Sequence, residues 1–362
     1  MFLSYIVQNR IAASRGVGMK SEKRSRELHE RALVIDGHSD MLNDVLPKRN
    51  LGRKHVIEED WLPEMRKGGI DVRVAAVFNE EEYVPELALR RGLDLVSVLL
   101  EEIEESKSLV LCTTCDDIRR AGENGRTGFI LGMEGTEPLG MDLHLLRVFH
   151  ALGLRILGLT HNLRNYAADP AQLTPAETGK AGGLSSFGVR LVEEADRLGV
   201  LIDLSHISDT GFWDVIERTG RPVIASHSNA RALLDHPRGL TDEQIKAVSR
   251  NGGVIGINAC AVLVGRSEES TLEQLIHHLD HIVKAGGIEC VGLGLDFADY
   301  LKKYFNPEAA ARYPYMGPVQ GLSGDAEVPK ITEELLKRGY SDSDIELILG
   351  KNFLRVFEKV WG

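Results

Sequence analysis

The sequence predicts an α/β protein and, among α/β folds, a (β/α)8 TIM barrel. Three observations predict it: eight short runs rich in Val, Ile and Leu, amphipathic segments between most of these runs, and a length of 362 residues. The runs are almost continuously apolar, as expected of parallel strands that are buried on both faces. Eight strands alternating with helices are typical of this barrel, which takes roughly 200 to over 400 residues.

The predicted strands are bounded by glycine or polar residues. In chain order they cover residues 33–40, 72–79, 128–135, 154–162, 200–206, 222–228, 253–260 and 290–297. Most helical patterns between them begin at Ser, Thr or Asp and end at Gly, as helix caps do. They cover residues 85–106, 142–153, 185–199, 209–220, 241–253, 271–287 and 341–362. The rival fold, an open doubly wound sheet with a dinucleotide site, lacks support because no GxGxxG sequence opens a helix.

One barrel domain is expected to account for nearly all of the chain. Residues 1–29 are expected to form an N-terminal extension with a first helix, and residues 30–362 the single catalytic barrel. Met19 is a possible second start site. Residues 163–184 and 298–328 fit neither strand nor helix, and both follow a predicted strand. In a barrel, long segments at that position carry the active site.

The composition excludes several classes of protein. A formal net charge of −11 argues against a nucleic-acid partner, which needs a basic surface. No run approaches the roughly 18 apolar residues of a membrane-spanning helix, and the N-terminus lacks signal-peptide features. We therefore expect a cytoplasmic protein without a membrane anchor. Cys112 and Cys115 form an isolated CxxC, which is read as incidental small residues.

Ionisable residues end six of the eight predicted strands. Strand interiors disfavour charge, so this recurrence is hard to explain by chance. Because the C-terminal ends of the strands form the active face of a barrel, these side chains are expected to meet in one site. In strand order they are His38 and Asp40, Glu134, His161, His206, His227 and Asp296.

The residue types and spacing predict a metal site. His38 and Asp40 are two positions apart, so both can face the barrel axis and meet one cation. Imidazole nitrogen and carboxylate oxygen suit zinc. His206 and His227, from adjacent strands, could hold a second ion, and Glu134 has two oxygens with which to bridge both. Two such ions can polarise a carbonyl and activate a shared water.

Neighbouring ionisable residues are given supporting roles. Asp203, three residues before His206, is expected to face inward or to support a ligand. Asp36 is expected to point inward below His38, and Ser39 to point away from the site. Five other histidines are expected on outer helices in solvent: His144, His150, His277, His278 and His281.

These residues lie in motifs that resemble the membrane dipeptidase, or renal dipeptidase, family of zinc metallopeptidases. The resemblance covers roughly residues 30–358 and rests on "DGHSD", "GMEG", "LTHN", "GGLSSFG", "LIDLSH", "SHSNAR", "GLDF" and "GKNFLRVF", in the family's order. It implies a barrel of the metal-dependent hydrolase type, with two zinc ions, that hydrolyses dipeptides. It also implies one zinc on His38, Asp40 and Glu134, and the other on Glu134, His206 and His227.

The resemblance implies further roles for three residues. His161 would contact the scissile carbonyl and stabilise the oxyanion, and Asp296 would handle the proton. Arg238 would hold the C-terminal carboxylate of the substrate, which would restrict substrates to dipeptides; Arg231 is the second choice. Ala298-Asp299 replaces the second Asp-Gly that many family members carry, which leaves the side-chain preference open. We expect a C-terminal D-residue to be tolerated.

Two other functions remain open. An amidohydrolase acting on N-acyl amino acids or cyclic amides could use the same two metals, although no lysine ends a predicted strand to form the carbamylated bridge common in such enzymes. A barrel that binds metal without catalysis would be plausible only if a ligand or Asp296 were missing, and none is. A homodimer is expected.

Overall fold

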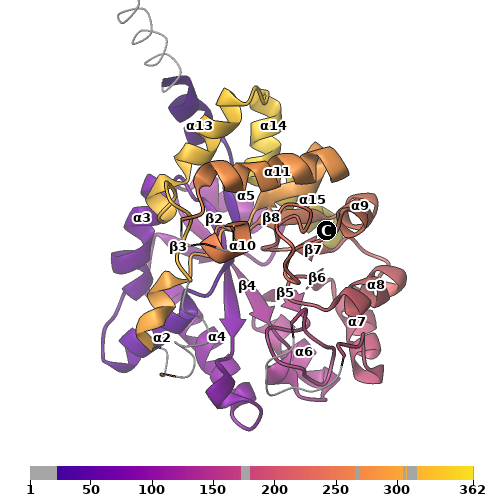
Figure 1. Cartoon of the computed structure of the whole chain (residues 1–362). Helices are drawn as coiled ribbons and strands as arrows, with labels where there is room; N and C mark the ends of the chain where they lie inside the picture. Colours follow the sequence, from indigo (N-terminus) through magenta and orange to yellow (C-terminus); the bar gives the residue numbers. More distant parts are fainter. Residues whose placement is uncertain are drawn as a thin grey trace, which may run out of the picture.

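The computed structural model of the chain describes residues 23–172, 180–265, 267, 269–304, 307 and 316–361. A closed ring of eight parallel strands forms its centre, surrounded by helices (Figure 1). The ring closes because β2 pairs with β4 as well as with β1, and β9 pairs with β1 as well as with β8. The predicted (β/α)8 barrel is confirmed. The ring strands are β1 (Ile35–Ser39), β2 (Val72–Phe78), β4 (Thr127–Glu134), β5 (Leu154–Gly158), β6 (Leu201–Asp203), β7 (Ile224–Ala225), β8 (Val254–Ile257) and β9 (Val291–Leu293).

A ninth strand, β3 (Leu109–Leu111), was not predicted. It pairs only with the first three residues of β4 and lies outside the ring. Three residues that follow a long helix give too short an apolar run to be recognised as a strand.

The helices lie where the sequence patterns predict them, with additional ones in the remaining connections. A helix over residues 23–31 comes first. Three capping boxes and two serine caps explain why the starts of five predicted helices are accurate. The others are α2 (Leu42–Asn50), α3 (Leu62–Lys67), α4 (Ala88–Glu105), α5 (Cys115–Glu123), α6 (Leu143–Ala151), α7 (Ser186–Leu198), α8 (Asp209–Arg218), α9 (Asp242–Arg250), α10 (Ala261–Gly265), α11 (Leu272–Gly286), α13 (Pro329–Lys337), α14 (Asp342–Glu346) and α15 (Asn352–Trp361).

Two apolar clusters make up the core. The larger cluster fills the layer between the strands and the surrounding helices. The smaller one joins the first residues of the strands, such as Val72, Leu201 and Val254, to Phe353 and Phe357 of α15. Helix α15 therefore covers the N-terminal end of the barrel, and the C-terminal end is left for the site.

Strand β1 contains a bulge that changes the expected direction of one side chain. Asp36 pairs with Arg73 of β2 and Ser39 pairs with Ala75, so β1 has one residue more than β2 over this stretch. The alternation of faces is interrupted between Asp36 and His38. Asp36 therefore does not lie on the barrel axis below His38, contrary to the sequence prediction.

Asp36 instead belongs to a buried ion cluster behind the strands. Arg73 donates to Asp36 over 3.0 Å and to Asp325 over 2.9 Å. Asp325 lies in a short 3-10 turn, η6 (Asp325–Glu327), close to α3. The opposite neighbour of Arg73 in β4 is Phe129, which packs in the layer under the helices. The cluster thus ties the chain before α13 to the outer side of β1 and β2.

The chain entering the barrel is fixed to the helical layer. In the helix over residues 23–31, Leu28 is buried, and the ring of His29 hydrogen-bonds to Thr332 and to the carbonyl of Gly68. Met19 and the extension before it lie outside the described residues. No helix within the described ranges is long and apolar enough to cross a membrane. The domain boundary at residue 30 and the cytoplasmic location stay predictions.

Two smaller expectations have different outcomes. Cys112 and Cys115 are buried and not disulfide-bonded, and burial raises the pKa of Cys115 to about 11, so both are inert core residues. His278 is not solvated: it is 1% exposed, and its two ring nitrogens contact the backbone N–H of Ala230 and the carbonyl of Val264. It faces inward from α11 and joins α10 to the chain that follows β7.

Candidate metal centre

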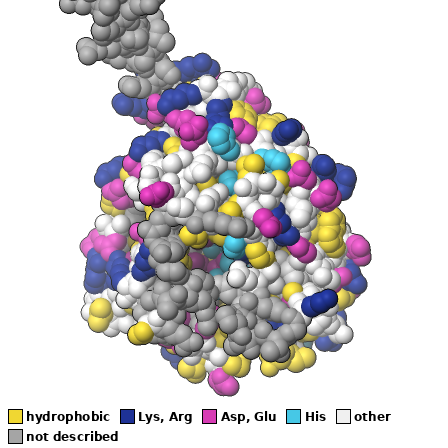
Figure 2. Space-filling model, in the orientation of Figure 1, with side chains coloured by type: hydrophobic (Ala, Val, Ile, Leu, Met, Phe, Trp, Pro, Cys, Tyr) yellow, Lys and Arg dark blue, Asp and Glu magenta, His cyan; other side chains and the backbone are white. Residues whose placement is uncertain are grey.

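The structure brings all seven predicted strand-end residues together at the C-terminal end of the barrel. Together with Asp203 they form three groups, two of which share His38, and within each group the ligand atoms lie within 4.8 Å of one another. Histidine side chains are visible near the middle of the face drawn in Figure 2. The groups are His38 with Asp203 and His227, Glu134 with His161 and His206, and His38 with Asp40 and Asp296.

Glu134, the last residue of β4, lies at the centre with its two oxygens turned to different partners. Its Oε2 is 3.5 Å from Nε2 of His38, which is also 3.5 Å from Oδ1 of Asp40. Its Oε1 is 3.0 Å from Nε2 of His206 and 3.3 Å from Nε2 of His227. One carboxylate thus joins two separate sets of donor atoms, as a bridging ligand must.

The tautomer of His227 follows from its neighbours. Ser226 Oγ lies 2.5 Å from Asp203 Oδ2 and 2.7 Å from Nδ1 of His227. An ionised carboxylate can only accept, so the single hydroxyl proton of Ser226 goes to Asp203. Ser226 must then accept a proton from Nδ1 of His227. The Nε2 of His227 is left with a free lone pair, as a metal ligand requires.

The same reasoning applies to His206. Its Nδ1 lies 3.2 Å from the side-chain oxygen of Asn162, which can only accept, so Nδ1 carries the proton. Nε2 of His206 and Nε2 of His227 then face each other over 3.0 Å, both as acceptors, beside Oε1 of Glu134. Three acceptors converge without a donor, an arrangement that a cation stabilises.

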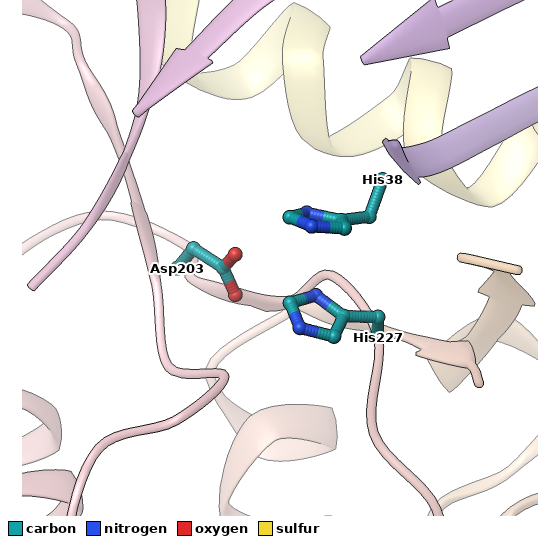
Figure 3. Close-up of side chains that lie close together, drawn as sticks. All are labelled: His38, Asp203 and His227. Carbon is teal, nitrogen blue, oxygen red and sulfur yellow. The ribbon is translucent and has the colours of Figure 1, made fainter. Parts of the chain in front are cut away.

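Asp203, at the end of β6, faces the rings of His38 and His227 (Figure 3). Its Oδ1 accepts from the backbone N–H groups of Ser205 and Ser226, over 3.0 and 2.8 Å. Its Oδ2 accepts the Ser226 hydroxyl. With both oxygens engaged, Asp203 supports a ligand and is not itself a good one, which agrees with the sequence interpretation.

Two further buried atoms indicate a cation. His38 Nε2 and Asp40 Oδ1 have no hydrogen-bond partner within the described part of the chain. A buried polar atom without a partner is costly, and most have one. Three imidazoles and two carboxylates are also a donor set that zinc accepts. The residues present therefore fit a metal centre.

The charges of the site are unbalanced without a cation. Burial opposes charge on His38, but Glu134 and Asp40 outweigh it and raise the pKa of His38 well above its usual range. Burial, together with the neighbouring Glu134, raises the pKa of Asp40 to about 8. Burial likewise raises the pKa of Asp296 to about 6, against the opposing effect of His38. Three carboxyl groups share a dry site, and positive charge would keep them ionised.

His161 and Arg238 lie at the edge of this cluster. The ring of His161 packs against Phe78 and His206, and burial lowers its pKa, so it is neutral at pH 7. Arg238 is half-buried, donates to the carbonyl of His227 over 3.3 Å and lines a small cavity with His227. Arg231 makes two 2.7 Å bonds to Asp209, which occupies its guanidinium. Of the two candidates, Arg238 is the one that remains available to a ligand.

Backbone strain is found at two of these residues. His206 has φ 67° and Asp296 has φ 52°, values in the left-handed region that residues other than glycine seldom adopt. Such conformations cost free energy and persist where the surroundings enforce them, commonly at active sites.

Three residues of the site are not recognised from the sequence. Asn162, Ser226 and Asn258 each hydrogen-bond a predicted site residue, namely His206, His227 and Asp296. Each lies at or just beyond a strand end; Asn162 and Ser226 adjoin His161 and His227, whereas Asn258 adjoins no ionisable residue. A polar residue next to a candidate ligand is the only indication in the sequence. It does not identify the group with which that polar residue forms a hydrogen bond.

The sequence and the fold of this chain are similar to those of known metallopeptidases. The family model described as "Membrane dipeptidase (Peptidase family M19)" matches residues 22–361. A metallopeptidase from Rhodobacter sphaeroides, solved with a phosphinate mimic of the dipeptide L-Ala-D-Ala, is 26% identical over 91% of this chain and 99% of its own, with a TM-score of 0.80. A structure described as dipeptidase AC, of family M19, is 28% identical over the same shares, also with a TM-score of 0.80.

A third solved structure is described as an amidohydrolase from Pseudomonas aeruginosa. It is 25% identical over 93% of this chain and 99% of its own, with a TM-score of 0.78. The family model covers nearly the whole chain, including every residue of the site. The chain belongs to the membrane dipeptidase family, peptidase family M19.

Proposed function

We propose that this protein is a zinc-dependent dipeptidase with two ions in its site. His38, Asp40 and Glu134 would hold one ion, and Glu134, His206 and His227 the other. The observation that carries the proposal is the division of the two Glu134 oxygens between His38 on one side and His206 and His227 on the other. Bound zinc supplies Lewis acidity and lowers the pKa of water to about 7.

The other residues of the site would bind the substrate and move its proton. Neutral His161 can donate a hydrogen bond to the scissile carbonyl oxygen, on which negative charge develops. Asp296, which groups with His38 and Asp40, is placed to take a proton and pass it to the leaving amine. Glu134 would bind both ions as a bridging carboxylate and so fix their relative positions.

Arg238 would select the length of the substrate. Its guanidinium can bind a carboxylate through two parallel hydrogen bonds. Fixed beside His227, it would bind the free carboxylate one residue beyond the cleaved bond, so a longer peptide would not fit. The mimic bound in the Rhodobacter sphaeroides relative supports extending the proposal to dipeptides with a C-terminal D-residue.

A metal and substrate assay tests the proposal. Purified protein should contain zinc, and it should hydrolyse dipeptides but not the matching tripeptides. Asp296→Asn should keep the metal and lose at least about 100-fold in kcat. Protein that binds no zinc, and that cleaves no dipeptide in a panel varying both side chains and the chirality of the second residue, would overturn it.

An amidohydrolase acting on N-acyl amino acids or cyclic amides is the second candidate. The similarity to the Pseudomonas aeruginosa amidohydrolase structure favours testing it. Comparing N-acyl amino acids with free-amine dipeptides, at equal zinc content, separates the two. The expected homodimer can be checked on the same preparation by light scattering.

A further inference from the structure

Asn258 follows β8, one of the two predicted strands that end without an ionisable residue. Its side chain is fully buried, and its amide Nδ2 donates a 2.9 Å hydrogen bond to Oδ2 of Asp296. Its Oδ1 accepts a 2.7 Å bond from the backbone N–H of Cys260. A backbone N–H can only donate, so this bond fixes the oxygen of the amide and leaves the NH2 group for Asp296.

The backbone of Asn258 is held just as firmly. Asn229, two residues after His227, accepts from the N–H of Asn258 over 3.1 Å and donates to its carbonyl over 2.9 Å. The hydrogen bonds therefore run from the chain after β7, through the chain after β8, to Asp296 beyond β9. Rotating the Asn258 amide would leave buried polar groups unpaired on both sides.

Asp296 depends on this support. It lies three residues beyond β9 in a left-handed conformation, so strand pairing does not hold it. Within the described residues, the bond from Asn258 is the one hydrogen bond that its carboxylate accepts. The bond engages Oδ2 and leaves Oδ1 without a hydrogen bond within the described residues, and one oxygen of Asp296 lies within 4.8 Å of ligand atoms of His38 and Asp40.

We propose that Asn258 is a positioning residue that orients the Asp296 carboxylate for proton transfer. The inference rests on the role proposed above for Asp296. Holding Oδ2 stops the carboxylate from rotating, so Oδ1 faces the substrate in a fixed direction, and catalytic groups lose rate steeply when misplaced. The amide has to be a donor here, because an acceptor would face a carboxylate.

Asn258→Asp tests this with almost no change in shape. The new carboxyl group still accepts from Cys260 N–H, but beside Asp296 it either repels it as a like charge or shares one proton with it, so the neutral donor to Oδ2 is lost. We expect kcat to fall about 10- to 100-fold, the effect of losing a hydrogen bond to a charged group, with KM within about 3-fold and zinc content unchanged. Asn79→Asp is the matched control, because Asn79 is also buried after a strand but donates to the carbonyl of Ala88. It should lower thermal stability and leave kcat intact.

The double variant Asn258→Asp/Asp296→Asn gives a readout that does not depend on activity. It restores a donor and an acceptor with their places exchanged, so it should regain the thermal stability lost by Asn258→Asp while remaining inactive. Full kcat in Asn258→Asp, an equal loss of kcat in Asn79→Asp, or no regain of stability in the double variant would overturn the inference. Failure of the dipeptidase proposal would appear separately, as a wild-type protein that cleaves no dipeptide.

Discussion

The two ends of the barrel are built from the same strands and have opposite chemistry. At the N-terminal end, apolar residues of the strands pack on Phe353 and Phe357 of α15, both fully buried. At the C-terminal end the same strands carry carboxylates and imidazoles that are buried or partly buried, together with two left-handed residues. The first arrangement stabilises the fold and the second costs stability. Substitutions at the two ends should therefore separate stability from activity.

Glu134→Gln should give the largest effect at the C-terminal end. A neutral amide is a poor bridging ligand, so we expect loss of bound metal and at least a 1000-fold (~4 kcal/mol) loss of kcat/KM. Metal analysis and dipeptide turnover measure this. Burial opposes the charge of Glu134, but the surrounding imidazoles outweigh it and hold its pKa well below the usual range, so the metal-free variant should also lose some thermal stability. A variant that retains its metal and its rate would remove Glu134 from the centre.

Phe357→Ala should give the opposite result at the N-terminal end. Phe357 is fully buried and stacks on Trp361 with ring centroids 4.3 Å apart. Removing a buried phenyl ring typically costs about 3–5 kcal/mol. Denaturant unfolding should show that loss, and kcat per folded molecule should equal that of the wild type. A lower kcat at full folding would mean that the two ends are coupled.

The C-terminal end shows what sequence can predict. His38, Asp40 and Glu134 are recognisable because charge at the end of an apolar strand is unusual, and parallel strands bring such ends together. The strands and capped helices follow from local patterns in the same way. Ser226 and Asn258 are not recognisable, because their role depends on which atom of a neighbouring strand they face.

The errors have physical causes as well. The predicted direction of the Asp36 side chain is wrong because a bulge adds one residue to β1. The alternation of apolar and polar residues in the sequence does not indicate this bulge. The prediction for His278 is wrong because the buried face of α11 is broad enough to include this histidine at its edge, which a helical pattern with a polar appearance does not reveal. In both cases contacts distant in sequence override a local pattern.

Ser226→Ala tests how far the surroundings of the ligands matter at the C-terminal end. The change removes the acceptor of the Nδ1 proton of His227 and leaves Asp203 Oδ2 without its hydroxyl donor. Loss of such a partner typically weakens metal binding about 10- to 100-fold. Competition with a chelator measures the affinity. Ser228→Ala is the matched control, since Ser228 is buried on the other side of His227 and its hydroxyl contacts Ser205. Equal losses in the two variants would contradict the tautomer argument.

The smallest predicted effect concerns the loss of stability caused by burying the carboxyl group of Glu137 at the C-terminal end of the barrel. Glu137 follows β4, accepts a 3.1 Å hydrogen bond from Asn165, and burial raises its pKa from 4.5 to about 7. Between these two pH values the folded protein holds a proton that the unfolded chain has lost, so stability falls as pH rises. Glu137→Gln should therefore stabilise the metal-loaded protein by roughly 1–3 kcal/mol at pH 8 and leave it unchanged at pH 4.5. Thermal unfolding at both pH values measures this. Equal stability of variant and wild type at pH 8 would show that Glu137 ionises there without cost, and that the C-terminal end is better solvated than its burial indicates.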